Sequence, residues 1–221
     1  KTDILIVGSG CAGLYCALNL PKDRKITVIT KADAKSNDSF LAQGGMCMLK
    51  DETDYDSFFE DTMKAGHYEN DETSVDIMIH SSQDVVKDLL RFGAEFQKDE
   101  NGELLFTKEG AHSQKRIIFH EDVTGKEITS TLLKEVKKQS NITILEQGTC
   151  YGAVLQMKDG RVEKAEADYT VLATGGVGGL YKHSTNFRHL TGDAIAVAMR
   201  HGIELRDISY VQIHPTTFYS V

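Results

Sequence analysis

The chain has 221 residues, of which 40% are hydrophobic and 26% are charged, and its formal net charge is −8. This length and composition predict one or two globular domains with a substantial core, and the acidic balance argues against a nucleic-acid-binding protein. We expect no membrane association and a cytoplasmic location, because the sequence has no run long enough to cross a bilayer and no secretory leader, although processing before Lys1 could conceal one.

The cysteines and histidines form no metal-binding pattern. Cys11, Cys16, Cys47 and Cys150 make neither a CxxC pair nor a zinc spacing, and the histidines make neither HxxxH nor HExxH. We therefore expect reduced thiols in a cytosolic protein and no metal ion.

The first twenty residues predict a nucleotide-binding unit. The apolar run at residues 4–7 leads into GSGCAG at residues 8–13 and then into a second apolar segment at residues 14–20. This order is typical of a buried parallel strand, a glycine turn and a helix. In a GxGxxG turn the glycines allow a tight turn, a close approach to a pyrophosphate and close helix packing, while the helix N-terminus faces the phosphates.

A second parallel strand is predicted at residues 25–30. In a standard NAD site an acidic residue follows this strand and binds the ribose hydroxyls. Here Lys31 follows instead, and Asp33 comes two residues later. The adenosine end of the ligand should therefore be held in a different way.

Paired glycines, Gly44 and Gly45, lie in the next segment, at residues 39–46. The segment is either a hinged loop or a place where backbone N–H groups face a planar ligand or its phosphates. Composition alone leaves both interpretations open.

Two helices are predicted in the middle of the chain, at residues 56–65 before Gly66 and at residues 71–92 before Gly93. A turn is predicted at residues 99–102. The longer helix has an apolar stripe typical of a core face, made of Val75, Ile79, Val86 and Leu89 or Leu90.

Residues 107–119 form a polar segment without helical periodicity. It is either a solvated loop or a loop that lines a polar ligand site. It brings together Glu109, His112, Ser113, Lys115 and Arg116.

The following elements alternate between helix and strand. Thr124 and Glu127 predict a capping box for a helix that carries Ile128, Leu132 and Val136. A strand is predicted at 141–146, and segments 150–157 and 161–167 predict a hairpin around Lys158-Asp159-Gly160.

A further buried strand at residues 169–172 ends in ATGG at residues 173–176, at the edge where open α/β sheets bind ligands. Thr191-Gly192-Asp193 predicts the cap of a small-residue helix at residues 194–200, which Gly202 closes. HPT follows at residues 214–216.

Five of these motifs occur in the order seen in one family: GxGxxG, AQGG at residues 42–45, ATGG, TGD and HPT. From about residue 3 to its end, the chain resembles the flavoprotein family of succinate dehydrogenase, fumarate reductase and L-aspartate oxidase. The resemblance implies an α/β, Rossmann-like FAD-binding fold with a parallel sheet, glycine turns at strand ends and a small antiparallel β insertion. It also implies that residues 1–221 are the N-terminal part of an FAD-binding domain, without the capping domain and the C-terminal return segment.

Within the family, the chain is most similar to the aspartate-oxidising members. The dehydrogenases and reductases usually have a histidine that bonds covalently to FAD, and Asp38 takes its place here, which implies non-covalent FAD. Residues 109–113 resemble the EGGHS segment of the aspartate-oxidising members, whereas the fumarate and succinate enzymes have a glutamine near Glu109. The Glu109 carboxylate could pair with the ammonium of an amino acid and penalise a dicarboxylate that lacks nitrogen.

The resemblance also implies a set of site residues. The implied catalytic residues are Glu109 and His214, and the latter would bind a substrate carboxylate. The implied cofactor-binding residues are Gly8, Ser9, Gly10, Ala12 and Gly13 at the pyrophosphate, the basic Lys31, Ser39, Gln43, Gly44 and Gly45 near the flavin ring and ribityl chain, Ala173, Thr174 and Gly175 on the adenosine side, and Asp193.

The implied reaction oxidises L-aspartate to iminoaspartate with oxygen or fumarate as acceptor, the first step of NAD biosynthesis through quinolinate. Functional coupling to quinolinate synthase is also implied. The family's catalytic arginine lies beyond the HPT motif, so we expect residues 1–221 alone to be inactive.

Three alternatives remain. The first is a soluble fumarate reductase or succinate dehydrogenase flavoprotein, against which Glu109, His112 and Asp38 count. The second is a flavin-binding module without catalysis. The third is an NAD-binding regulatory domain, which Lys31 and the additional glycine turns disfavour.

Overall fold

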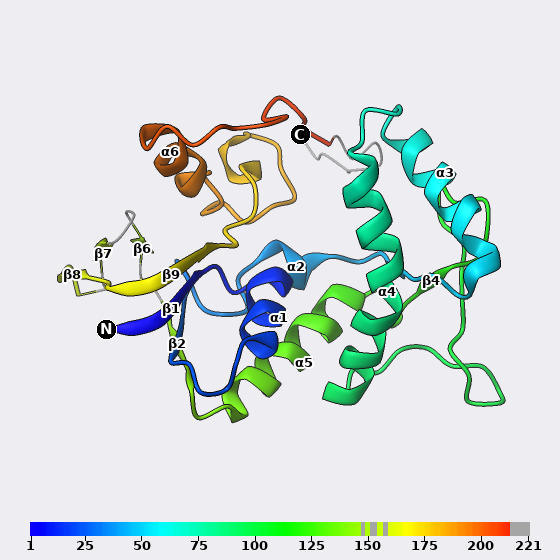
Figure 1. The fold of residues 1–221 in the computed structure, drawn as a ribbon, viewed down its shortest axis with the longest axis horizontal. Coiled ribbons are helices and arrows are strands. Elements are labelled where there is room, and N and C mark those ends of the chain that lie inside the picture. The colour runs from blue at the N-terminus through cyan, green and yellow to red at the C-terminus, as the bar shows by residue number, and fades with distance from the viewer. Residues whose placement is uncertain (147–148, 151–153, 157–158, 213–221) are drawn as a thin grey trace.

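A four-stranded parallel sheet forms the centre of the protein (Figure 1). The computed structural model describes residues 1–146, 149–150, 154–156 and 159–212. In spatial order the strands are β5 (Ile142–Leu145), β2 (Ile26–Ile29), β1 (Thr2–Val7) and β9 (Ala167–Leu172). Every neighbouring pair is parallel, and Ile4 of β1 lies opposite Ile26 of β2 and Tyr169 of β9. The predicted parallel sheet is therefore confirmed.

Helices cover one face of this sheet. They are α1 (Cys11–Asn19), α4 (Glu72–Phe92) and α5 (Thr124–Lys138). Side chains alternate along β1, so Ile4 and Ile6 point to this face, where they join Leu14 of α1 and Leu132 of α5 in the main core. Figure 1 shows α1 and α5 next to each other beside the sheet, with α4 beyond them.

The opposite face carries a smaller apolar cluster around Leu5 and Ile29. An antiparallel insertion follows β5 and contains β6 (Thr149–Cys150), β7 (Val154–Gln156) and β8 (Val162–Lys164). Gln156 pairs with Val162, so the predicted hairpin is present, although Lys158 of its turn lies outside the described residues.

The predicted pair of helices in the middle of the chain is confirmed as α3 (Tyr55–Ala65), after the short η1 (Glu52–Asp54), and α4. Asp71 caps α4 by accepting a hydrogen bond from the Ser74 amide, and Gly93 ends it with a φ of +96° that favours glycine. Leu89 belongs to the buried stripe, whereas Leu90 is 36% exposed.

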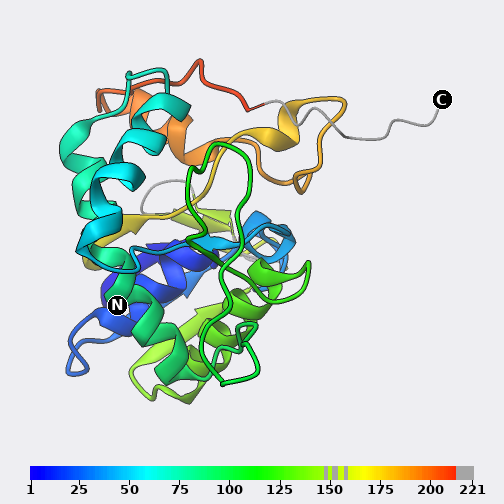
Figure 2. The ribbon, with the colours of Figure 1, turned by 90° about the vertical axis from the view of Figure 1, so that its right-hand side faces the viewer.

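A two-stranded antiparallel sheet joins the AQGG segment to the polar loop before residue 117. It consists of β3 (Met46–Cys47) and β4 (Ile117–Ile118). A Cβ at Gly45 would collide with the Ile117 side chain and the Ile118 carbonyl oxygen, so only glycine permits this approach. Figure 2 shows the loop before β4, in green, on the same side of the molecule as α2 (Asp38–Leu41), in blue.

The remaining helices are η2 (Gly178–Leu180) and α6 (Asp193–Arg200), and Gly202 follows α6 as predicted. The cap predicted at residues 191–193 is wrong in detail. Gly192 is the N-cap residue, and no side chain caps the helix. The Thr191 hydroxyl instead donates a hydrogen bond to Asp193 Oδ1, at 2.7 Å.

The capping box predicted for α5 is also wrong. Val123 is the N-cap residue, and Thr124 already lies in the first turn. The Thr124 hydroxyl accepts a hydrogen bond from the His120 amide, and the Glu127 carboxylate accepts one from the Glu95 amide. Both side chains therefore fasten other loops to the helix instead of capping it.

The burial predicted for residues 169–172 is wrong too. Tyr169 is 71% exposed and Leu172 is 49% exposed. The reason is that β9 pairs only with β1 and is the last strand of the sheet in the described part of the chain.

None of the described helices is both long and apolar enough to span a bilayer.

Candidate functional site

A cavity of about 700 Å³ opens where β1, β2 and β9 end. Val7, Ile29 and Leu172, at the carboxyl ends of these strands, line it together with the turns that follow. The cavity therefore lies at the edge where open α/β sheets bind ligands. Its size is within the range of small-molecule and cofactor sites, roughly 300–1,000 Å³.

The first glycine turn lets three pieces of backbone meet at this cavity. Gly8 has a φ of +121°, and a Cβ there would collide with the Ala173 carbonyl, so glycine is required where the first turn meets the second. A Cβ at Gly13 would collide with the Gly8 carbonyl oxygen, so this glycine lets α1 pack onto the turn. The arrangement is the one that the GxGxxG pattern predicts.

The N-terminus of α1 forms part of the cavity wall. The Cys11 amide donates a hydrogen bond to Ser39 Oγ at 3.1 Å, and the Ala12 and Gly13 amides have no acceptor within the described ranges. Amides of a first helical turn have no partner in their own helix. Together with the positive end of the helix dipole they make a place for an anionic group such as a pyrophosphate.

Asn37 holds the loop before α2 against the first glycine turn. Its side-chain amide donates to the carbonyl oxygens of Ser9 at 3.3 Å and Ala34 at 2.9 Å, and its Oδ1 accepts from the Phe40 amide. The Ser9 hydroxyl donates to the Ala34 carbonyl as well. Sequence reasoning missed Asn37, although an asparagine at the N-cap of a short helix is a recognisable signal.

Lys31 connects the end of β2 to the start of α6. Its ammonium donates to the His189 carbonyl at 3.0 Å, to Thr191 Oγ1 at 2.9 Å and to Asp193 Oδ2 at 2.7 Å. Every N–H of the ammonium thus has an acceptor within the protein. The hydrogen bond from Lys31 lowers the pKa of the Asp193 carboxyl. Two of the predicted cofactor residues therefore bind each other and build one wall of the cavity.

The structure gathers most of the predicted cofactor residues around the cavity and separates a few. Those that line it are Gly8, Ser9, Gly10, Ala12, Lys31, Ser39, Ala173, Thr174, Gly175 and Asp193. Gly13, in the first turn of α1, is buried and does not belong to this lining. The lining does not include Gln43, Gly44 or Gly45, which belong to the segment that leads into β3.

Two further residues of the lining had no predicted contact. Asp38 Oδ1 accepts a hydrogen bond from the Phe187 amide at 3.1 Å. His189 Nε2 lies 2.9 Å from the Ser36 carbonyl oxygen, which can only accept, so Nε2 carries the proton. His189 had no signal in the sequence, because its contacts join segments that are far apart in the chain.

Glu109 lies beside the paired glycines. The position that a Cβ would take at Gly44 is 3.3 Å from Glu109 Oε2, and the β3–β4 pair holds the two segments together. Glu109 is exposed, and its carboxylate has no hydrogen bond or ion pair with any residue that the structure describes. His214, the other predicted catalytic residue, lies outside the described residues, as does the HPT motif.

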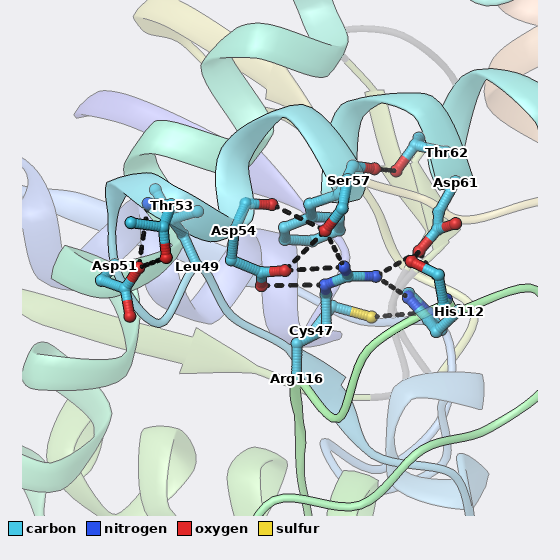
Figure 3. A network of polar contacts seen from close by, with 12 residues as sticks. Cys47, Leu49, Asp51, Thr53, Asp54, Ser57, Asp61, Thr62, His112 and Arg116 are labelled. Atoms are coloured by element: carbon cyan, nitrogen blue, oxygen red, sulfur yellow. Dashed lines mark hydrogen bonds and ion pairs between the residues drawn. The ribbon is translucent and has the colours of Figure 1, made fainter.

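Arg116, from the same polar loop, is fully buried (Figure 3). Its Nε and Nη2 donate to the two carboxylate oxygens of Asp54 at 3.0 and 2.8 Å, and Nη2 also donates to Ser57 Oγ at 2.7 Å. The guanidinium lies 4.9 Å from the centre of the Phe58 ring. Burial alone would raise the pKa of the Asp54 carboxyl, but the hydrogen bonds from Arg116 and Ser57 outweigh burial and lower it. The solvated-loop interpretation is therefore wrong for Arg116.

These residues fit a dinucleotide cofactor. Gly8 and Gly13 leave the backbone bare where a Cβ would close the turn, and the amides of Ala12 and Gly13 can take an anion. The cavity continues from this turn to the second glycine turn and to the start of α6.

Comparisons with known proteins agree with this description. A family model described as an FAD binding domain matches residues 3–221. The L-aspartate oxidase of Clostridium perfringens is 48% identical over 99% of this chain and 52% of its own length, and that of Clostridium acetobutylicum is 44% identical over the same shares. The solved E. coli quinol fumarate reductase has a TM-score of 0.87 and 25% identity, over 90% of this chain and 37% of that one. The chain thus spans about half the length of the curated relatives that it matches.

Proposed function

Because this chain belongs to the FAD binding domain family, we propose that it is the cofactor-binding part of an L-aspartate oxidase. The two relatives with 48% and 44% identity carry that name. We further propose that residues 1–221 are the N-terminal part of the protein, as the resemblance of the ordered motifs to the family implies. The matched relatives are about twice as long as the chain. A capping domain and a C-terminal return segment would complete it.

The observation that supports L-aspartate as the substrate is the position of the Glu109 carboxylate beside Gly44. No described residue forms an ion pair with this carboxylate. L-Aspartate has an ammonium that succinate and fumarate lack. A carboxylate at this position pairs with that ammonium and gains a charge-assisted hydrogen bond. A dicarboxylate without nitrogen leaves the same carboxylate desolvated and unpaired, which costs binding free energy.

The residues of the cavity would hold FAD, which supplies the two-electron oxidation of the substrate α-carbon when it is bound. The turn at residues 8–13 and the first amides of α1 would bind the pyrophosphate. Lys31 and Asp193 would close the wall on the adenosine side. The segment at residues 42–45, which lies outside the cavity lining, would orient the ring, and His214 would bind a substrate carboxylate.

We propose that FAD is bound without a covalent bond. Asp38 stands in the place where the dehydrogenases and reductases of the family usually have the histidine that bonds to FAD. Its carboxylate lacks the imidazole nitrogen that forms this bond, and the Phe187 amide already donates a hydrogen bond to it. This feature favours an oxidase over a succinate dehydrogenase or fumarate reductase flavoprotein.

The proposed ligands are L-aspartate and fumarate, with oxygen or fumarate as the electron acceptor. The product, iminoaspartate, enters the synthesis of NAD through quinolinate, and we include functional coupling to quinolinate synthase in the proposal. A cytoplasmic location is supported by the free thiols of Cys11, Cys16 and Cys47, which suit a reducing compartment.

The test uses the full-length parent protein with L-aspartate and oxygen. Formation of hydrogen peroxide and iminoaspartate is the expected result. Succinate-dependent dye reduction without aspartate turnover would assign the protein to the dehydrogenases and reductases instead. Acid precipitation should release all of the FAD into solution, and flavin retained in the pellet would contradict the non-covalent assignment.

A further inference from the structure

The loop that carries Glu109 is closed at its base by backbone hydrogen bonds. The Thr107 amide donates to the Ile117 carbonyl at 2.9 Å, and the Ile117 amide donates to the Thr107 carbonyl at 3.2 Å. Ile117 opens β4, which pairs with β3 directly after Gly45. This base places Glu109, two residues beyond Thr107, beside the paired glycines. It does not by itself determine the path of the loop beyond Glu109.

That path is held by a single carboxylate oxygen on α3. Asp61 Oδ2 accepts hydrogen bonds from the Ser113 amide at 2.6 Å and from the Ser113 hydroxyl at 2.7 Å. It also accepts one from Arg116 Nη1 at 2.5 Å (Figure 3). Because Asp54 fixes the other edge of the guanidinium, Arg116 and Asp61 form a rigid anchor between α3 and the loop.

Between this anchor and the base, the loop adopts a strained turn. The His112 amide closes it on the Glu109 carbonyl at 3.3 Å, and Ala111 has a φ of +70°. A residue other than glycine remains in this left-handed region only when its surroundings hold it there. The anchor at Ser113 supplies that restraint four residues after Glu109.

The anchor also keeps His112 neutral. An arginine can only donate, so His112 Nδ1, 3.1 Å from Arg116 Nη1, is an acceptor, and Nε2 carries the proton that faces Cys47 Sγ at 3.2 Å. Burial, together with the charge of Arg116, lowers the pKa of His112. His112 is therefore neutral and does not compensate the charge of Glu109.

We propose that Asp61 and Arg116 are positioning residues that hold the Glu109 carboxylate at Gly44 and thereby set the preference for a dicarboxylate that carries an ammonium. The inference rests on the proposed function and deepens it. It assigns the specificity of the site to an anchor on α3 that would touch neither the substrate nor the cofactor.

The experiment uses the full-length parent protein with Asp61→Asn and Ser113→Ala, which weaken the anchor in different ways. Asp56→Asn is the matched control, since Asp56 lies on the same helix, is exposed and has no hydrogen bond or ion pair with the described residues of the loop. Two activities are measured for each protein: the oxidation of L-aspartate and the reduction of fumarate by a reduced dye. Fumarate fills the same site without an ammonium.

We expect both anchor variants to lower kcat/KM for L-aspartate by about tenfold, the effect of one weakened charge-assisted hydrogen bond. Fumarate reduction should stay within about twofold of the wild type, as should both activities of Asp56→Asn. In a Glu109→Gln background, Asp61→Asn should have no further effect on aspartate oxidation, because the anchor acts only through Glu109.

Equal losses for both activities, or effects of Asp61→Asn and Glu109→Gln that simply add, would overturn the positioning role and leave the oxidase intact. If Asp61→Asn fails to fold, the ratio of aspartate oxidation to fumarate reduction in Ser113→Ala tests the positioning role instead. A wild-type protein that reduces fumarate but never oxidises aspartate would overturn the proposed function itself.

Discussion

Lys31 Nζ lies 2.7 Å from Asp193 Oδ2, although the two residues are 162 positions apart in the chain. The pair joins the end of β2 to the start of α6, so the wall of the cofactor cavity depends on one lysine at the place where an NAD site would have an acid. Lys31 is 35% exposed and Asp193 is 41% exposed, which limits the contribution of the ion pair to stability. Its main role is to shape and neutralise this wall.

Replacement of Lys31 by methionine should weaken the binding of FAD to the full-length protein. The Asp193 carboxylate would then stand uncompensated beside an anionic cofactor. We expect about a fivefold higher dissociation constant, the scale of a partly exposed ion pair, measured by flavin fluorescence during titration of the apoprotein. Lys22→Met, at an exposed site outside the cavity, is the control. Equal affinities in the two variants would show that Lys31 has no part in the wall.

Replacement of Gly8 by alanine should reduce both stability and FAD content. The new Cβ meets the Ala173 carbonyl in a backbone conformation with a φ of +121°, so β1 and β9 must separate at the cavity. Strain of this kind costs about 1–3 kcal/mol before any collision is counted. Thermal unfolding and the ratio of flavin to protein absorbance measure the two effects.

Gly176→Ala is the control for that substitution. Gly176 also lines the cavity, but a Cβ there meets no atom within 4 Å. Its unfolding temperature should stay close to that of the wild type. A Gly8→Ala protein as stable as Gly176→Ala would contradict the close approach of the two glycine turns.

Replacement of Arg116 by methionine should destabilise the protein strongly. It would leave the carboxylates of Asp54 and Asp61, whose side chains are 5% and 14% exposed, without their shared cation. Breaking a buried ion pair from one side costs about 3–5 kcal/mol. Urea unfolding followed by circular dichroism measures this change.

Arg91→Met provides the comparison, because Arg91 is 68% exposed and pairs with Asp88 on the surface of α4. Loss of this surface pair should change the free energy of unfolding by less than about 1 kcal/mol. Similar losses in the two variants would mean that the buried network contributes no more than a surface pair.

The Asp61 carboxyl should make stability depend on pH in the acid range. Burial alone would raise its pKa, but the hydrogen bonds from Ser113 and Arg116 outweigh burial and lower the pKa below its ordinary value of 3.8. A lowered pKa means that the folded state binds the proton less tightly than the unfolded state. The contribution is complete above the ordinary pKa and is lost as the pH falls through the lowered one.

We therefore expect Asp61→Asn to lose less stability than the wild type between about pH 5 and about pH 3. Urea unfolding at several pH values gives the slope of the free energy of unfolding against pH for the wild type and for Asp61→Asn. Asp56→Asn, on the same helix, should keep the slope of the wild type. A steeper loss in Asp61→Asn would contradict the direction of the shift.

The sequence by itself determined the elements whose causes are local. The apolar run and glycine turn of β1 and α1, the cap of α4 at Asp71 and its end at Gly93 all follow from short-range hydrogen bonding and backbone conformation. The five ordered motifs likewise indicated an FAD-binding fold before any packing was known.

Only the tertiary structure decided which charges are compensated and which side chains stay exposed. Arg116 and Lys31 look alike in the sequence, but one is buried between two carboxylates and the other lies partly exposed at the cavity wall. Tyr169 belongs to an apolar strand and is still exposed, because β9 is the last strand of the described sheet. Such outcomes depend on partners that lie far away in the chain, and the desolvation of a charge or a ring is set by those partners rather than by its neighbours in sequence.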